Sequence, residues 1–228
     1  MIGAKKLWDR LVTLAKSGTS GYFTQDEFNS NLNSVQYAII SLLCDNYENN
    51  QKVSDALRRH IKEVVGTTQA NGKMFVTNTT TNLTDYYRGM SVVYVNVDGE
   101  YPSYKINTNE VSMYQTSSIR KANLAKNRTL WYVSDDNIQL LPKQALGYRH
   151  FYCKKPLEAK IGFTTAEDDD NDYLVVDPTT TIDIDFPEGL FNLFVYFMLE
   201  SMGIEQKENL ITEYSQLGIT RTTQTDLK

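Results

Sequence analysis

The stretch that decides the fold runs from residue 131 to residue 156, WYVSDDNIQLLPKQALGYRHFYCKKP. It predicts three short strands separated by turn residues: 131–133, then 138–141, which Pro142 ends, and finally 147–154. Aromatic and β-branched side chains between polar turn residues are typical of a pleated, half-buried sheet. The residues before this stretch favour helices and then strands, and those after it become acidic and then helical again. The sequence therefore predicts an α+β protein with a central antiparallel β layer.

Three amphipathic helices are predicted ahead of the β layer. The first, over residues 4–16, has leucines at positions 7, 11 and 14 that form one apolar stripe. The second opens with Thr24-Gln25-Asp26-Glu27, a capping box that satisfies free backbone amides. Its buried stripe is predicted to contain Phe28, Leu32, Val35, Ile39 and Leu42. The third is predicted over residues 53–65 from apolar residues at 53, 57, 61 and 64.

The middle of the chain favours strands. Residues 67–84 are rich in Thr and Asn and predict a loop or weakly paired strands. The pattern 91–97, Asp98-Gly99, 100–106 is typical of a β-hairpin with the turn at Asp-Gly. Further strands are predicted at 110–114 and 158–163, with a basic, polar loop or arm over 117–129 between them.

The last third begins with an acidic segment, EDDDND, at Glu167–Asp172. A calcium-binding EF-hand starting at Asp168 needs glycine and glutamate where this chain has Tyr173 and Thr179, so we expect a solvated loop. Strands are predicted at 173–176 and 180–186, followed by a helix that starts around Pro187. Its part from 189 to 202 is apolar nearly all round and is predicted to be buried, with Gly203 as its cap. A last amphipathic helix is predicted over 205–217.

These elements predict four segments along the chain. They are an N-terminal helical segment (1–66), an antiparallel β domain (67–186), C-terminal helices that pack with the N-terminal ones (187–218) and an extended tail (219–228). The C-terminal helices form a predicted pair.

Charge is distributed unevenly along the chain. Residues 1–156 contain 19 basic and 13 acidic residues, a net charge of +6, whereas residues 157–228 contain 4 basic and 15 acidic residues, a net charge of −11. One interpretation is a solvated acidic loop followed by an acidic helix face. The other is that the two regions meet oppositely charged surfaces on neighbouring copies.

The sequence offers no recognisable catalytic, cofactor-binding or metal-binding pattern, and we predict neither an enzyme nor a cofactor. The chain has two histidines, His60 and His150, without a matched nucleophile motif. Its two cysteines, Cys44 and Cys153, lie too far apart in sequence to indicate a disulfide framework or a metal site. No membrane span or signal peptide is expected, which favours a soluble protein made in a reducing compartment. The basic loop containing Arg120, Lys121, Lys126 and Arg128 favours either solvation or contact with nucleic acid.

Four pieces, in this order, carry a resemblance to a known family: FTQDEFNSNLNSVQYAII (23–40), NIQLLPKQALGYRHFYCKKP (137–156), the acidic loop, and IDIDFPEGLFNLFVYFMLESMGIEQKENLITEYSQLG (182–218). Together they resemble ring or adaptor proteins of the head-to-tail connector in short-tailed phages, especially the crAss-like group. Cys153 is an atypical residue in the strand that ends at Pro156.

The resemblance implies a structural virion protein, made in the bacterial host cytoplasm, that forms a homo-oligomeric ring beneath the portal. Its implied partners are further copies of itself, the portal protein, tail or further ring proteins, and the packaged DNA in the channel; no membrane is involved. The alternatives are another virion component (a tail hub or tube, or a capsid-associated protein), a host- or DNA-binding module, or an enzyme of a type that the sequence does not identify.

Overall fold

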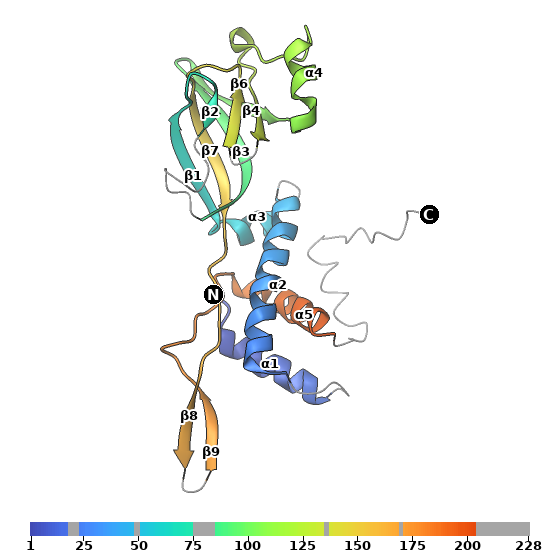
Figure 1. Ribbon diagram of the computed structural model, residues 1–228, viewed down its shortest axis with the longest axis vertical. Coiled ribbons are helices and arrows are strands. Elements are labelled where there is room, and N and C mark those ends of the chain that lie inside the picture. The colour runs from blue at the N-terminus through green and yellow to red at the C-terminus, as the bar shows by residue number, and fades with distance from the viewer. Residues whose placement is uncertain (18–22, 48–50, 75–84, 135–136, 169–170, 204–228) are drawn as a thin grey trace, which may run out of the picture. The chain divides into compact units, whose positions relative to one another are not determined.

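The computed structural model describes residues 1–17, 23–47, 51–74, 85–134, 137–168 and 171–203 (Figure 1). It divides the chain into two compact units. A helical unit contains residues 1–59 and 156–228, and a β unit contains residues 60–155. The α+β fold class is confirmed. The β unit begins at residue 60 and ends at residue 155. Both boundaries of the predicted β domain, 67–186, therefore lie too late in the sequence.

Helices α1 (Ala4–Ser17), α2 (Gln25–Asp45) and α5 (Phe191–Ser201) build the core of the helical unit, with α5 packed against both α1 and α2. The predicted capping box is present, since the Thr24 hydroxyl accepts from the Glu27 amide and the Glu27 carboxylate accepts from the Thr24 amide. Most of the predicted apolar stripe residues of α1 and α2 are buried, but Leu14 of α1 and Leu42 of α2 are only half-buried, and Leu43 is buried in place of Leu42.

The third predicted helix is only half right. Helix α3 spans Gln51–Leu57 and buries Val53 and Leu57, but strand β1 begins at Ile61 and runs to Thr67. All seven residues of β1 pair with β7 (Gly147–Lys154). The apolar spacing fitted a helix, but the β-branched residues of this segment find a strand partner far along the chain, and tertiary pairing overrides the local pattern.

A second, polar face of α2 holds the segment where the chain returns to the helical unit. The Asn29 side chain donates to the carbonyl oxygen of Ile161 (3.1 Å) and accepts from its amide (2.8 Å). Gln25 donates to the same carbonyl at 2.8 Å, and Asn33 accepts from the amide of Ala159 at 3.1 Å. We call Gln25, Asn29 and Asn33, spaced four residues apart on one helix face, the amide ladder.

The ladder explains why residues 158–163 do not form the predicted strand. Side chains of α2 form hydrogen bonds with backbone groups of this segment that would pair with a neighbouring strand in a sheet. One isolated bridge, Lys160 with Ile182, links it to the segment 180–186, which was also predicted as a strand and forms only single bridges here and at Ile2–Ile184. The close approach of these segments requires Gly162, because a Cβ there would lie 1.9 Å from the Thr180 hydroxyl oxygen.

Helix α5 follows the short 3₁₀ turn η3 (Glu188–Leu190), and Pro187 precedes that turn. Five of its apolar side chains are buried, which confirms the predicted buried helix: Leu193, Phe194, Val195, Met198 and Leu199. Gly203, at a φ of +69°, follows its end as predicted. The last predicted helix (205–217) and the predicted tail lie outside the described residues.

A two-stranded hairpin, β8 (Phe163–Asp168) with β9 (Asn171–Val176), belongs to the helical unit. The prediction of a solvated loop at 167–172 is therefore wrong for its described residues, because Glu167 pairs with Asp172 and Asp168 with Asn171. The Thr-rich segment before them and Tyr173–Val176 after them, a predicted strand, form a continuous ladder that extends into the acidic residues.

The β unit contains a seven-stranded sheet in the order β1-β7-β3-β4-β5-β6-β2. The remaining strands are β2 (Lys73–Met74), β3 (Tyr86–Asn96), β4 (Gly99–Lys105), β5 (Leu130–Ser134) and β6 (Asn137–Leu141). The three strands predicted from residues 131–156 are confirmed as β5, β6 and β7. The predicted hairpin is β3–β4, with its turn at Val97-Asp98 and Gly99 already paired with Asn96. Strands β4 and β5 pair in parallel, and the other pairs are antiparallel.

Strand β5 is buried on both faces, which explains its unbroken apolar run. Trp131 packs into one cluster with residues of β2, β3, β6 and β7: Met74, Val92, Tyr94, Ile138, Leu140 and Tyr148, joined by Leu146. Its neighbours Leu130 and Tyr132 pack into a second cluster with Ile106 and Leu141.

The second cluster is partly covered by a helical segment that the sequence predicted as a strand. Residues 108–110 form the 3₁₀ turn η1 and 111–116 form helix α4, from which Val111 and Tyr114 pack on the cluster. The strand predicted at 110–114 is wrong because the Glu110 carboxylate accepts from the Asn107 amide at 3.2 Å and starts a helical turn instead.

In the part of the chain that the structure describes, no helix is long and apolar enough to cross a membrane.

The amide ladder gives a first prediction. Asn29→Ala should lower the free energy of unfolding by about 1–3 kcal/mol, because the Ile161 amide loses its acceptor. Asn31→Ala is the matched control, since the half-buried Asn31 side chain makes a solvent-exposed hydrogen bond to the Glu27 carbonyl of its own helix. Urea unfolding of both variants measures the difference. Equal stabilities would contradict the role given to Asn29.

The buried face of α5 gives a second. Phe194 is fully buried, with its ring centroid 5.2 Å from that of Phe186. Phe194→Ala should cost roughly 3–5 kcal/mol, the usual penalty for deleting a core aromatic side chain. Asn192→Ala, on the exposed side of the same helix, should change stability little. A loss below about 1 kcal/mol for Phe194→Ala would show that α5 is not the core helix described here.

Candidate functional site

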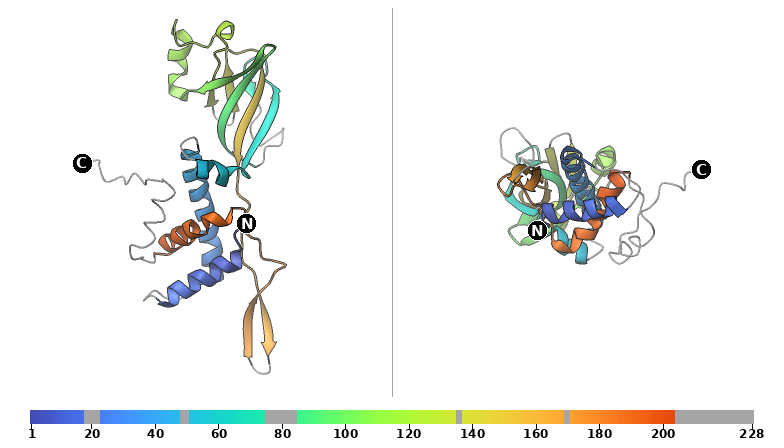
Figure 2. Two further views of the ribbon diagram at one scale, coloured as in Figure 1. Left: turned by 180° about the vertical axis from the view of Figure 1, so that it is seen from behind. Right: turned by 90° about the horizontal axis from the view of Figure 1, so that it is seen from below.

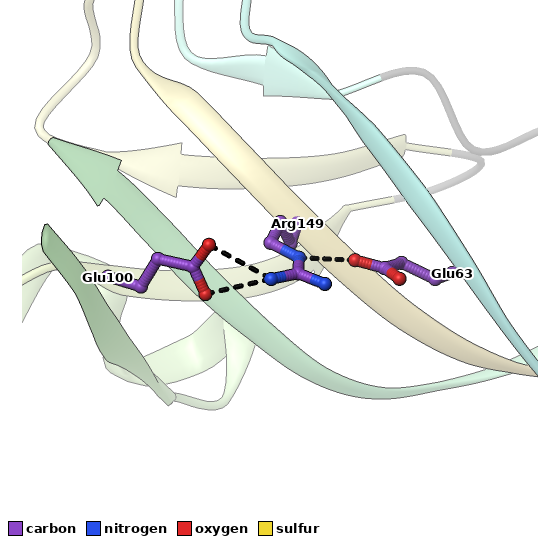
Figure 3. Close-up of polar contacts among 3 residues, drawn as sticks. All are labelled: Glu63, Glu100 and Arg149. Atoms are coloured by element: carbon purple, nitrogen blue, oxygen red, sulfur yellow. Dashed lines mark hydrogen bonds and ion pairs between the residues drawn. The ribbon is translucent and has the colours of Figure 1, made fainter.

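One arginine joins three strands on an outer face of the β sheet (Figure 3). Arg149 of β7 donates through Nη1 to both carboxylate oxygens of Glu100 on β4, at 2.9 Å each, and through Nε to Glu63 on β1. The guanidinium also lies over the Phe151 ring, 5.9 Å from its centroid. Hydrogen bonding to Glu63 and then to Glu100 raises the pKa of Arg149, and the bond from Arg149 lowers the pKa of Glu63. Each charged group of this site therefore has a partner of opposite charge within the chain.

The next residue of β7, His150, lies in an aromatic interior. Its Nδ1 is 3.0 Å from the carbonyl oxygen of Ser91, so Nδ1 carries the proton and donates to that oxygen. The ring centroids of Trp131 and Tyr86 lie 6.1 and 6.0 Å from that of His150. Gly89 makes room for this group, since a Cβ there would lie 2.8 Å from the Tyr86 hydroxyl oxygen and 3.1 Å from His150 Cε1.

His150 is 1% exposed, and its Nε2 has no hydrogen-bond partner among the described residues. Burial lowers the pKa of His150 to about 4, against a slight opposing effect of the bond to Ser91. Burial likewise raises the pKa of Tyr86 to about 12. Both side chains are therefore neutral near pH 7, and His150 is an uncharged part of the core there.

Tyr152, two residues further along β7, connects this interior to a surface ion pair. Its hydroxyl donates to Asp85 at 3.0 Å, and Lys62 of β1 donates to the other carboxylate oxygen of Asp85. Burial and the bond to Asp85 raise the pKa of Tyr152. Burial opposes ionisation of Asp85, but hydrogen bonds from Lys62 and Tyr152 outweigh it and lower its pKa. This cluster fastens the start of β3 to β1 and β7.

The remaining residues weighed for chemistry have structural positions. His60 is buried, and its carbonyl accepts from the amide of Lys154 at 2.7 Å. Cys44 and Cys153 are buried and are not joined in a disulfide. Among the described residues, no group of three or more His, Cys, Asp and Glu side chains is arranged as a metal site.

A surface pocket of about 360 Å³ adjoins the amide ladder in the helical unit. It is lined by Asn29, Ser30 and Asn33 of α2, by residues 158–160 and by Ile182. Asn29 and Asn33 already bind backbone groups of the chain, which leaves Ser30, Glu158 and Lys160 as the other polar side chains of the lining.

The basic segment, residues 117–128, is the predicted arm, and the structure gives it order. The Ser117 hydroxyl accepts from the amides of Ile119 and Arg120, at 3.3 and 2.9 Å. Asn123 and Arg128 exchange two backbone hydrogen bonds, of 2.7 and 2.9 Å, that close a tight loop. The side chains of Arg120, Lys121 and Lys126 are exposed. These turns therefore present an ordered cationic surface.

No protein-family model matches the chain, and no curated protein matches it as a relative. The site must therefore be judged from its own geometry. Sequence reasoning found the basic segment but missed the Arg149 bridge and the amide ladder. The bridge joins residues 86 and 49 positions apart and leaves no local signal. The ladder does leave one, because Gln25, Asn29 and Asn33 repeat at helical spacing on a helix whose other face is apolar.

The buried histidine predicts a stability that falls with acid. The unfolded chain takes up a proton at His150 near the ordinary pKa of 6.5, whereas the folded chain does so only at about 4. The contribution is therefore complete above about pH 6.5 and is lost as the pH falls from there towards 4, by roughly 2 kcal/mol at pH 5. Urea unfolding of wild type and His150→Met across this range measures it, since the carboxylates titrate in both. Parallel pH profiles would contradict the prediction.

Proposed function

We propose that this protein is a structural virion protein that forms a ring beneath the portal of a short-tailed phage. As a head-to-tail connector, or adaptor, it lines the DNA channel and links the portal to the tail. Its partners in this role are further copies of itself, the portal, tail or further ring proteins, and the packaged DNA.

The observation that carries the proposal is that the charge asymmetry follows the two folded units. The β unit has 12 basic and 7 acidic residues, a net charge of +5, whereas the helical unit has 11 basic and 21 acidic residues, a net charge of −10. A ring requires heterologous contacts, in which one surface of a subunit meets a different surface of the next. Opposite charge on two separate units favours such contacts and disfavours self-stacking of like surfaces.

Two further features support a structural role. The order of motifs from Phe23 to Gly218 resembles that of connector ring proteins, as described above. The exposed side chains of Arg120, Lys121 and Lys126 provide cations that suit a DNA phosphate backbone or an acidic neighbour.

The role of the histidines in this proposal is structural. His60 and His150 are buried in the β unit, and Nδ1 of His150 is hydrogen bonded to the backbone of β3. We assign neither of them a part in catalysis.

The proposal predicts assembly that depends on the portal and on salt. The purified protein should be largely monomeric, because weak charge pairs alone do not close a ring, and it should form rings on the portal. Those rings should weaken as sodium chloride rises, since exposed charges are screened beyond about 8–10 Å at physiological salt. Replacing Asp168, Asp169 and Asp170 by lysine should reduce ring formation without unfolding the chain. Native mass measurement of the protein, alone and with the portal across a salt series, tests this.

A matched control makes the same change in net charge at another place in the chain. Glu205, Glu208 and Glu213 changed to lysine give the same shift outside the hairpin and should affect assembly less. Salt-insensitive rings would show that apolar contacts hold the assembly. A protein that never joins the portal would contradict the connector assignment.

A further inference from the structure

The hairpin β8–β9 forms a two-stranded sheet of its own, separate from the seven-stranded sheet. Only its base is fastened within the described residues. The Phe163 ring packs edge-on against Trp8, with centroids 5.1 Å apart, and the Asp177 amide donates to the Gly162 carbonyl at 2.9 Å. Figures 1 and 2 show both strands running outward from this base with no other described element of the helical unit beside them. Both outer edges of the ribbon are therefore unpaired in the part of the chain that the structure describes.

Such a ribbon calls for a partner. An isolated two-stranded hairpin is marginally stable in water, and its free edges carry unpaired amides and carbonyls. Residues 163–176 contain five acidic residues and no basic ones. Like charge prevents two such ribbons from pairing with each other, and it favours a cationic partner.

The basic segment of the β unit has the complementary character. Residues 111–134 contain four basic residues and no acidic ones. Arg120, Lys121 and Lys126 take part in none of the ion pairs found among the described residues. Ile119, at 83% exposure, directly precedes Arg120 and adds an apolar side chain that a docked partner would cover.

We infer that the β8–β9 hairpin of one copy docks on the basic segment (117–128) of a neighbouring copy. This inference rests on the proposed ring, and it names the two surfaces that join successive subunits. The contact is heterologous, as a ring requires, because the two surfaces belong to different units of the chain. DNA is the competing occupant of the basic segment, and the experiments below separate the two.

The first experiment traps the contact between two differently labelled chains. One carries Thr165→Cys, at an exposed position on β8, and the other carries Ile119→Cys. The mixture, alone and with the portal, should give a disulfide-linked pair of one chain of each kind. Thr165→Cys mixed with Lys143→Cys, another exposed site in the β unit, is the matched control and should give little. Wild-type chain measures any background from the buried native thiols. No enrichment over the control, with and without portal, would overturn the inference.

The second experiment exchanges the charges. Arg120, Lys121 and Lys126 changed to glutamate should lower the yield of the trapped pair by about tenfold, the scale expected for several exposed ion pairs turned repulsive. Changing Glu167, Asp168 and Asp172 to lysine in the partner chain should restore it. Arg58, Arg59 and Lys143 changed to glutamate carry the same net charge change elsewhere and should leave the yield near wild type. A loss that the reversed partner does not rescue counts against docking.

The outcomes for docking and for the connector role can be told apart. A trapped pair from a protein that never binds the portal supports the contact and rejects the connector. Portal-bound rings without the trapped pair reject the contact and leave the connector standing. Binding of double-stranded DNA that requires Arg120, Lys121 and Lys126, without a trapped pair, assigns the basic segment to DNA and overturns the inference.

Discussion

The helical unit depends on the way α2 binds a piece of backbone. Asn29 accepts from the amide of Ile161 and donates to its carbonyl, so one side chain does for this residue what a neighbouring strand does in a sheet. A buried peptide group without such a partner is costly, and the chain has no strand at this point to supply one. The hairpin leaves directly after this segment, and the residues before α5 return beside it. Helix α2 thus packs into the core with its apolar face and holds the segment around Ile161 with its polar face.

Strand β7 carries a similar division in the β unit. Successive side chains of a strand lie on opposite faces of the sheet. Arg149 therefore forms its ion pairs on the outer face, whereas His150 and the residues two positions before and after it lie on the other face. The outer residue, Arg149, keeps its charge because two carboxylates bind it, and the inner one, His150, is neutral because it is buried. The strand with the most backbone partners therefore also contains the most sharply contrasting electrostatic environments. A one-residue register shift would exchange these environments, which strongly favours the observed pairing.

The sequence predicted those elements whose pattern is local. Aromatic runs between turn residues identified β5, β6 and β7, and a capping box with a leucine-type stripe identified α2. Prediction from the sequence failed where the hydrogen-bonding partners of a segment lie far away in the chain. Residues 61–65 were predicted as the end of a helix but belong to a strand that pairs with β7, about 80 to 90 residues later. Residues 158–162 were predicted as part of a strand, but their backbone binds helix side chains instead. For the interaction surfaces, charge counts along the chain indicated an asymmetry, but only the fold assigned it to two units and gave the basic segment its ordered turns.

The chain enters and leaves the β unit at one point. The carbonyl of His60 accepts from the amide of Lys154, and Ile61 pairs with Cys153, so the first and last strands of the unit start and finish side by side. A folded module whose two ends meet can be inserted into a host fold, or removed from it, at a single loop. The β unit is a folded module of this kind, because its two ends meet. The boundaries after residues 59 and 155 are therefore a natural site for grafting another domain in place of this unit.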